Sequence, residues 1–226
     1  MTRELLEQRI SHLQQEILHL GITVEQSILD VVAALRRRDT ATARRIVAQD
    51  QEINERRFTL EDECLTLIAT QQPMARDLRL LAAVLEIITE LERMGDYAKG
   101  IANIILLLGS EPLPPDLLDH FDRMASLATG MLRQALVAFV AGDDKRAREI
   151  PAQDDKVDAL YNTVYRELVA RMIENPESID HATHLLWVAH NLERFADRVT
   201  NICERTVFMA TGDLREIRST HDELDG

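Results

Sequence analysis

The sequence predicts an all-α protein made of two tandem, pseudo-symmetric, antiparallel three-helix bundles, with six long helices in total. Three observations support this fold. Aromatic residues make up only 4% of the 226 residues, while the strong helix formers Ala, Leu, Glu and Arg dominate. Apolar residues recur at steps of three and four along most of the chain. Two short segments of the first half also return, in the same order, in the second half.

The first half of the chain contains three predicted helices. In the first helix, one apolar stripe is interrupted only at Ser27. Its members are Leu6, Ile10, Leu13, Ile17, Leu20, Val24, Val31 and Leu35. Asp39 is the expected N-cap of a second helix, which ends before Pro73. A third helix is expected from about Met74 to Leu108.

After a proline-dense linker, residues 111–115 (EPLPP), the same order follows again. A fourth helix ends at Gly142 and the two aspartates after it. Its buried stripe is expected to contain Leu117, Phe121, Met124, Ala128, Met131 and Ala135. A fifth helix runs from about Lys145 to Glu174, and Pro151 can kink it. A sixth helix is expected over about residues 177–210.

The repeated segments indicate an internal duplication. IVAQDQEIN (46–54) aligns with IPAQDDKVD (150–158), and ELERMGD aligns with NLERFAD. Long helices joined by short turns pack as antiparallel neighbours, so each repeat is expected to fold into one bundle. The predicted domains are residues 1–110 and 116–212, joined by the linker, with a polar tail over residues 213–226.

Composition narrows the functional classes. The formal net charge of −13 argues against a nucleic-acid partner, because phosphate contacts need a clustered positive surface. Cys64 and Cys203 lie far apart with no metal-binding spacing, so both are expected to be buried thiols of a cytoplasmic protein. The most apolar tract, at residues 101–109, is too short to span a bilayer. Contact with a membrane is therefore expected only through partners.

Each repeat carries two acidic residues four positions apart on an otherwise apolar helix face. The first pair, Glu92 and Asp96, lies in ELERMGD, and the second pair, Glu193 and Asp197, lies in NLERFAD. Like charges at this spacing repel by about 0.2–0.5 kcal/mol in water, and by more where they are buried. The recurrence of this costly pair in both repeats indicates a binding site.

Folding each helix pair into a hairpin brings further acids to the same level. Asp50 and Asn54 lie opposite the first acidic pair, and Asp154 and Asp158 lie opposite the second. Packed carboxylates need neutralisation, either by a metal cation or by protons held at raised pKa values. The expected cofactors are divalent or trivalent metal ions with oxygen ligands, namely Mg²⁺, Mn²⁺, iron or Zn²⁺, and hard ions are favoured over a structural zinc.

Two alternatives remain open from the residues alone. In a metal-free structural protein, Arg93, Arg194 and Arg198 would pair with the acids. In a di-metal carboxylate enzyme, Glu-x-x-His would be required on two helices. The first helix has one such motif, Glu16 to His19, and the fourth has none.

Two segments, QQPMARDLRLLAAVLEIITELERMGDYAKGIAN and HLLWVAHNLERFADRVTNICE, resemble the signature segments of the PhoU family of phosphate-transport accessory and regulatory proteins. The similarity covers about residues 3 to 212. It implies two three-helix bundles whose acidic motifs bind metal clusters in some members. The carried-over ligands are Asp50, Glu92, Asp96, Asp154, Asp158, Glu193 and Asp197. Asn54, Gly100 and Arg198 depart from the usual pattern, which favours the second site over the first.

The resemblance also implies a role. Family members are understood to couple a phosphate ABC transporter to a sensor histidine kinase, as negative regulators of phosphate uptake and phosphate-starvation signalling. A homodimer is expected. The chain has no P-loop, nucleophile elbow or Rossmann glycine pattern, which fits an adaptor and not an enzyme.

Overall fold

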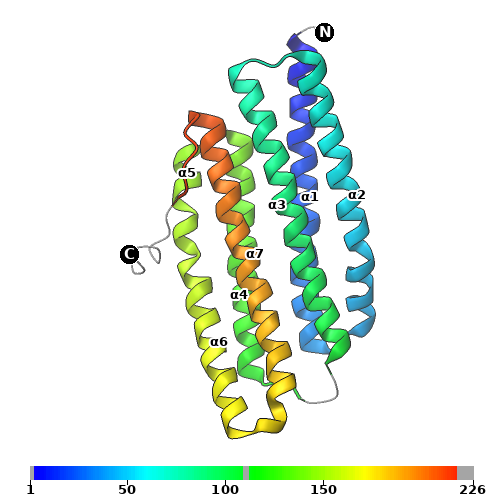
Figure 1. Ribbon diagram of the computed structural model, residues 1–226, viewed down its shortest axis with the longest axis vertical. Helices are drawn as coiled ribbons and strands as arrows, with labels where there is room; N and C mark the ends of the chain where they lie inside the picture. The colour runs from blue at the N-terminus through cyan, green and yellow to red at the C-terminus, as the bar shows by residue number, and fades with distance from the viewer. Residues whose placement is uncertain (1–2, 109–111, 218–226) are drawn as a thin grey trace.

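The computed structural model describes residues 3–108 and 112–217, and within these ranges every regular element is a helix. The elements are α1 (Arg3–Arg37), α2 (Thr40–Gln71), α3 (Ala75–Leu107), α4 (Pro115–Ala141), α5 (Asp144–Glu149), η1 (Pro151–Gln153), α6 (Asp155–Glu174), η2 (Pro176–Ser178) and α7 (Ile179–Thr211). Helices α1 to α3 form the first three-helix unit, and α4, α6 and α7 form the second (Figure 1). Helix α3 ends one residue before the expected end at about Leu108, and residue 111, the first of the predicted linker, lies outside the described residues.

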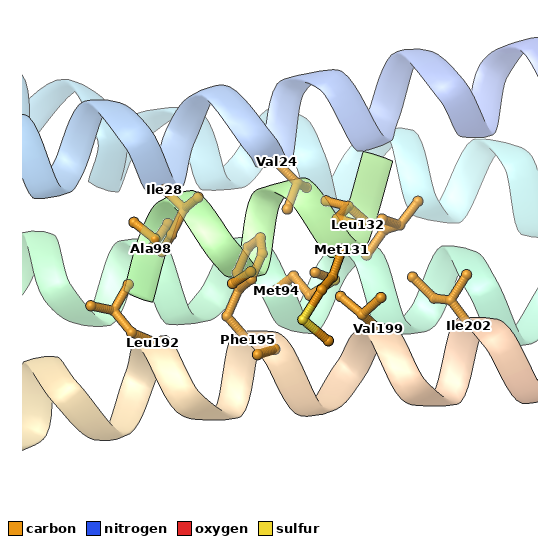
Figure 2. Close-up of a cluster of buried hydrophobic side chains, with 14 of the residues drawn as sticks. Val24, Ile28, Met94, Ala98, Met131, Leu132, Leu192, Phe195, Val199 and Ile202 are labelled. Atoms are coloured by element: carbon orange, nitrogen blue, oxygen red, sulfur yellow. The ribbon is translucent and has the colours of Figure 1, made fainter. Parts of the chain in front are cut away.

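The two units share one hydrophobic core. Helix α3 packs along α7, and α1 packs along α4, so that α2 and α6 lie on the outside. Figure 2 shows the centre of this core, where Val24 of α1, Met94 of α3, Met131 of α4 and Phe195 of α7 meet. All four side chains are fully buried. Because the core crosses the boundary between the units, the apolar faces of both repeats are needed to complete it.

The predicted apolar stripes of α1 and α4 are confirmed. In α1, every stripe residue from Ile10 to Leu35 is buried, and the polar exception, Ser27, donates its hydroxyl hydrogen to the Thr23 carbonyl at 2.9 Å. By length and composition alone, both helices are apolar enough to cross a membrane. Their apolar residues line the shared core instead, which accounts for their hydropathy.

The predicted N-cap of the second helix is also confirmed. Asp39 Oδ1 accepts the backbone N–H groups of Ala41 and Thr42 at 3.1 and 3.0 Å. These are two of the donors that have no partner inside the helix. Hydrogen bonding to this carboxylate lowers the pKa of Asp39.

Asp39→Ala is expected to lower the free energy of unfolding by about 1 kcal/mol, because the first turn of α2 loses its cap. Urea unfolding monitored by circular dichroism measures the change. Asp62→Ala makes the same chemical change at an exposed position inside α2, where alanine is the better helix former. An equal loss in both variants would contradict a capping role.

The predicted fifth helix is not continuous. Helix α5 ends at Glu149, a 3-10 turn follows from Pro151, and α6 begins at Asp155. Proline has no N–H to donate and its ring clashes with the carbonyl one turn earlier, so the helix breaks there and is not merely kinked. The break leaves Asp154 as the N-cap of α6. At the equivalent point of the first unit, α2 runs on without interruption.

Candidate carboxylate sites

The first site lies between α2 and α3 and consists of Asp50, Glu92, Asp96 and Lys99. Asp50 is only 5% exposed. Lys99 Nζ lies 2.6 Å from Asp50 Oδ2 and 3.7 Å from Asp96 Oδ1. The amide nitrogen of Asn54 donates a second hydrogen bond to Asp50 Oδ2 at 3.2 Å. The buried carboxylate of this site is therefore neutralised by a lysine of the same chain.

The acidic pair of the first site lies nearer to solvent. Glu92 is half-buried and Asp96 is exposed. Burial raises the pKa of Glu92, and the charge of Asp96 raises it further. Burial likewise raises the pKa of Asp96, with a contribution from Asp50, while Lys99 opposes the shift. The hydrogen bond that Lys99 donates to Asp50 raises the pKa of Lys99, so the ammonium form is favoured.

The second site lies between α6 and α7 and consists of Asp154, Asp158, Glu193 and Asp197. Asp154 is 8% exposed. Burial raises the pKa of Asp154 to about 7, and the charges of Asp158, Asp197 and Glu193 add to the shift. Burial also raises the pKa of Glu193 to about 7, and Asp197 again contributes. Asp154 thus interacts electrostatically with the other three predicted acids of this unit.

The arginines near the second site neutralise it only in part. Arg194 donates to Asp197 Oδ2 at 2.8 Å. Arg198 points instead toward α3, where its Nη1 donates to Glu90 Oε2 at 3.4 Å. The amide nitrogen of Asn201 donates to the same oxygen at 3.1 Å. Arg198 and Asn201 thus link α7 to α3 across the interface between the units.

Two carboxylate oxygens of the second site remain without hydrogen bonds. Within the described part of the chain, Asp154 Oδ1 and Glu193 Oε2 are buried and have no hydrogen-bond partner. Unsatisfied buried carboxylate oxygens are costly, and the deficit is met by a proton or by a cation. An oxygen-only donor set of this kind fits a hard metal ion.

Aligning the repeats shows why the two sites differ. Lys99 corresponds to Thr200, and Asn54 corresponds to Asp158. The first site therefore has three acids and a lysine, whereas the second has four acids and a threonine. In residues 3–108 and 112–217, no three His, Cys, Asp or Glu side chains converge closely enough to ligate one ion directly. A bound cation would be held through water, or after the carboxylates rotate toward it.

Comparison with known proteins agrees with this duplicated architecture. The PhoU domain model matches the chain twice, over residues 17–105 and 121–206. The chain belongs to the PhoU family. A phosphate-specific transport system accessory protein PhoU homolog of Caulobacter vibrioides is 38% identical over 96% of this chain and 94% of its own length. A homolog with the same description from Clostridium acetobutylicum is 35% identical, over 94% and 97%.

Solved structures of PhoU proteins have the same fold. The crystal structure of the phosphate transport system regulatory protein PhoU from Streptococcus pneumoniae superimposes with a TM-score of 0.86 at 33% identity, covering 93% of this chain and 99% of that one. PhoU from Pseudomonas aeruginosa superimposes with a TM-score of 0.85 at 30% identity, covering 92% and 99%. Each of the two matched PhoU domains contains its own acidic pair.

Sequence reasoning missed Lys99 and Glu90. Lys99 lies one turn after the acidic pair of the first PhoU repeat, and its contrast with Thr200 is visible when the repeats are aligned. Glu90 carries no comparable signal, because its partner Arg198 lies on α7. Glu16 of the Glu-x-x-His motif is paired with Arg56 of α2. That pairing accounts for Glu16 without a di-metal centre.

Both cysteines are buried, as expected. Burial raises the pKa of each thiol to about 12, so neither Cys64 nor Cys203 is a reactive thiolate. The Cys64 thiol donates to the Leu81 carbonyl at 3.3 Å. This hydrogen bond joins α2 to α3 across their hairpin.

The raised pKa values predict that the metal-free PhoU protein becomes less stable as pH rises. In the unfolded chain, Asp154 and Glu193 return to ordinary pKa values of about 4, whereas both pKa values are about 7 in the folded protein. Between these values the folded state binds more protons, so the free energy of unfolding falls from about pH 4 to about pH 7 and then levels off.

Asp154→Asn is expected to remove part of this slope. It should raise the free energy of unfolding by about 1–2 kcal/mol near pH 8, after allowance for solvent screening, and change it little near pH 4. Urea unfolding in the presence of a chelator, repeated across this pH range, measures the effect. Asp180→Asn, at an exposed position near the start of α7, is the control. Parallel pH profiles for wild type and Asp154→Asn would contradict the prediction.

Proposed function

We propose that this protein is an accessory and regulatory protein of a phosphate-specific transport system. The supporting observation is the extent of the likeness: relatives named for that system match up to 96% of the chain. In finer terms, the protein is a cytoplasmic adaptor between the phosphate ABC transporter and a sensor histidine kinase. It acts as a negative regulator and as a homodimer.

Transporter binding is tested with the phosphate ABC transporter of the same organism in lipid nanodiscs. The protein is expected to bind transporter-containing nanodiscs and to leave empty nanodiscs of the same lipid composition unbound. Equal retention on both would indicate lipid binding and would overturn the proposed partner. Sedimentation equilibrium of the free protein tests the homodimer, for which twice the monomer mass is expected.

The proposed coupling to the sensor kinase is tested by measuring kinase autophosphorylation in the same nanodiscs. With transporter and phosphate present, addition of the protein is expected to lower the rate of kinase autophosphorylation. The matched control omits the transporter and keeps the kinase, phosphate and protein. Equal inhibition in the control would mean that the protein acts on the kinase without coupling it to transport.

We infer further that the second site binds a divalent or trivalent cation, whereas the first relies on Lys99. The supporting observation is the pair of buried oxygens without hydrogen bonds on Asp154 and Glu193, of which the Glu193 oxygen lies 3.7 Å from His190 Nδ1. Asp50 of the first site also has one such oxygen, Oδ1, but its other oxygen is paired with Lys99 at 2.6 Å.

Asp154, Asp158, Glu193 and Asp197 would hold the ion through water, or after their side chains rotate toward it, and the ion would supply positive charge to these acids. Because the ion binds the folded state, the folded protein should be stabilised by the ion and destabilised by a chelator.

Metal content and thermal unfolding of the purified protein, before and after chelation, test this inference with Mg²⁺, Mn²⁺, Fe³⁺ and Zn²⁺. Glu193→Gln combined with Asp197→Asn is expected to abolish the stabilisation by metal. Glu92→Gln combined with Asp96→Asn makes the same substitutions in the first site. This control variant should still be stabilised by metal. A wild-type protein that is metal-free and indifferent to all four ions would support the metal-free structural reading.

A further inference from the structure

The chain folds back along α7 after the helix ends. Gly212, at a φ of +81°, ends α7 in the left-handed conformation that glycine adopts most easily. The following residues, 213–217, form a strap. At its end, the Ile217 N–H donates to Glu204 Oε1 at 2.9 Å, and the Ile217 side chain packs against the hydrophobic core. Backbone and side chain of Ile217 therefore both attach the strap to the bundle.

The strap forms one wall of an open cavity that reaches the second site. This cavity has a volume of about 270 Å³. Asp154, Asp197 and Glu204 line it, together with the guanidinium of Arg198, which donates to Glu90 at 3.4 Å. Glu216 and Ile217 of the strap complete the acidic side of the lining. Since a water molecule occupies roughly 30 Å³ in the liquid, the cavity has room for a cation with several of its waters.

Asp154, which lines this cavity, has a carboxylate oxygen that is not hydrogen-bonded within the described part of the chain. Its side chain is more than nine-tenths buried, and its Oδ1 atom has no hydrogen-bond partner among the described residues. Glu204 and Glu216 add two acids that the repeated motif does not contain. A hydrated cation in the cavity would neutralise Asp154 and both added acids without requiring three carboxylates to meet at one point.

We propose that the strap is the cover of the second site, and that Glu216 contributes a carboxylate to a hydrated divalent cation in this cavity. The proposal rests on the metal binding inferred above and adds to it a residue and a route of exit. With the strap in place, Ile217, which is attached to Glu204, obstructs part of the route by which a bound ion leaves. The strap therefore slows release, and Glu216 strengthens binding.

The cover is tested with two shortened proteins and Mn²⁺ as the probe. One ends at Gly212 and lacks the strap; the matched control ends at Ile217 and keeps it. Both proteins and wild type are loaded with Mn²⁺ and mixed rapidly with excess chelator. The protein ending at Gly212 is expected to release Mn²⁺ about tenfold faster than the control, the size of effect that outer groups have at metal sites.

The role of Glu216 is tested in the full chain by equilibrium dialysis with Mn²⁺. Glu216→Gln is expected to weaken binding about tenfold. Asp213→Asn removes the same charge from the same strap, but Asp213 is paired with Arg215 at 3.0 Å and does not line the cavity. This control should change the affinity by less than about twofold.

The outcomes separate the two proposals. If wild type binds Mn²⁺ but both shortened proteins release it at the same rate, the strap is not a cover. If Glu216→Gln and Asp213→Asn weaken binding equally, Glu216 acts only through the general charge of the tail, and its place at the site is wrong. If wild type fails to bind Mn²⁺ at all, the inferred metal binding fails as well.

Discussion

Thr200→Lys is expected to weaken Mn²⁺ binding by the second site about 100-fold. Thr200 corresponds to Lys99, and it lines the same cavity as Asp154 and Asp197. A lysine there would bring an ammonium group to the acids, as Lys99 does for Asp50. The ammonium and the metal ion would then compete for the same negative charge, and the ammonium is always present.

Titration of the metal-free variant with Mn²⁺ by calorimetry measures this change. Thr200→Met is the matched control, because methionine has a side chain of similar length and no charge. It should retain most of the affinity if charge is the cause. Equal losses in Thr200→Lys and Thr200→Met would mean that steric filling of the cavity, and not electrostatic replacement, explains the effect.

Lys99→Ala is expected to lower the free energy of unfolding by about 3 kcal/mol, because it leaves the buried carboxylate of Asp50 without its counter-charge. Asp50 is almost fully buried and Lys99 is its closest cation, at 2.6 Å. The remaining hydrogen bond from Asn54 does not offset a full charge. Urea unfolding at neutral pH, with chelator present, measures the loss.

The same experiment in an Asp50→Asn background isolates the interaction. There, Lys99→Ala should cost far less, and the difference between the two backgrounds gives the coupling free energy of the pair. Lys99→Arg retains the charge and should recover most of the stability. If Lys99→Ala costs the same with Asp50 present or replaced, the lysine contributes by packing its methylene groups and not by neutralising the acid.

Lys99→Ala also has a consequence for metal binding. Without the lysine, Asp50 loses its ion-pair partner, while Arg57 and Arg93 still act on Glu92. The first site then has three acids that are neutralised only in part, which resembles the second site. Added Mn²⁺ is therefore expected to restore part of the stability that Lys99→Ala loses, whereas wild type should gain nothing at this site. The same urea experiment with and without Mn²⁺ tests this in a variant whose second site carries Glu193→Gln and Asp197→Asn.

Helices and their boundaries were largely predictable from the sequence. The apolar stripes of α1 and α4 follow the helical period, and burying one stripe per helix requires no knowledge of the partner helix. Asp39 caps a helix through backbone groups only two and three residues away. Local signals of this kind do not depend on tertiary contacts. The exception is the fifth helix, where Pro151 breaks the chain although the pattern on both sides is helical.

The acids of the two sites were also predictable, because duplication presents them twice and the hairpin pairs α2 with α3 and α6 with α7. Seven carboxylates were named from spacing alone, and those of the second site lie together in the structure. Whether each carboxylate is neutralised depends on contacts between helices. The Lys99–Asp50 pair joins α2 to α3, and the Arg198–Glu90 pair joins α7 to α3.

The sequence by itself thus determined the helical fold, its duplication and the position of the acids, since each depends on periodicity or on near neighbours along the chain. Only the tertiary structure decided that Lys99 neutralises Asp50, that Arg198 turns to Glu90, and that the strap reaches Glu204. A long charged side chain has several low-energy rotamers and several partners within reach. Which partner it takes is set by how the helices pack, and that information is not local in the sequence.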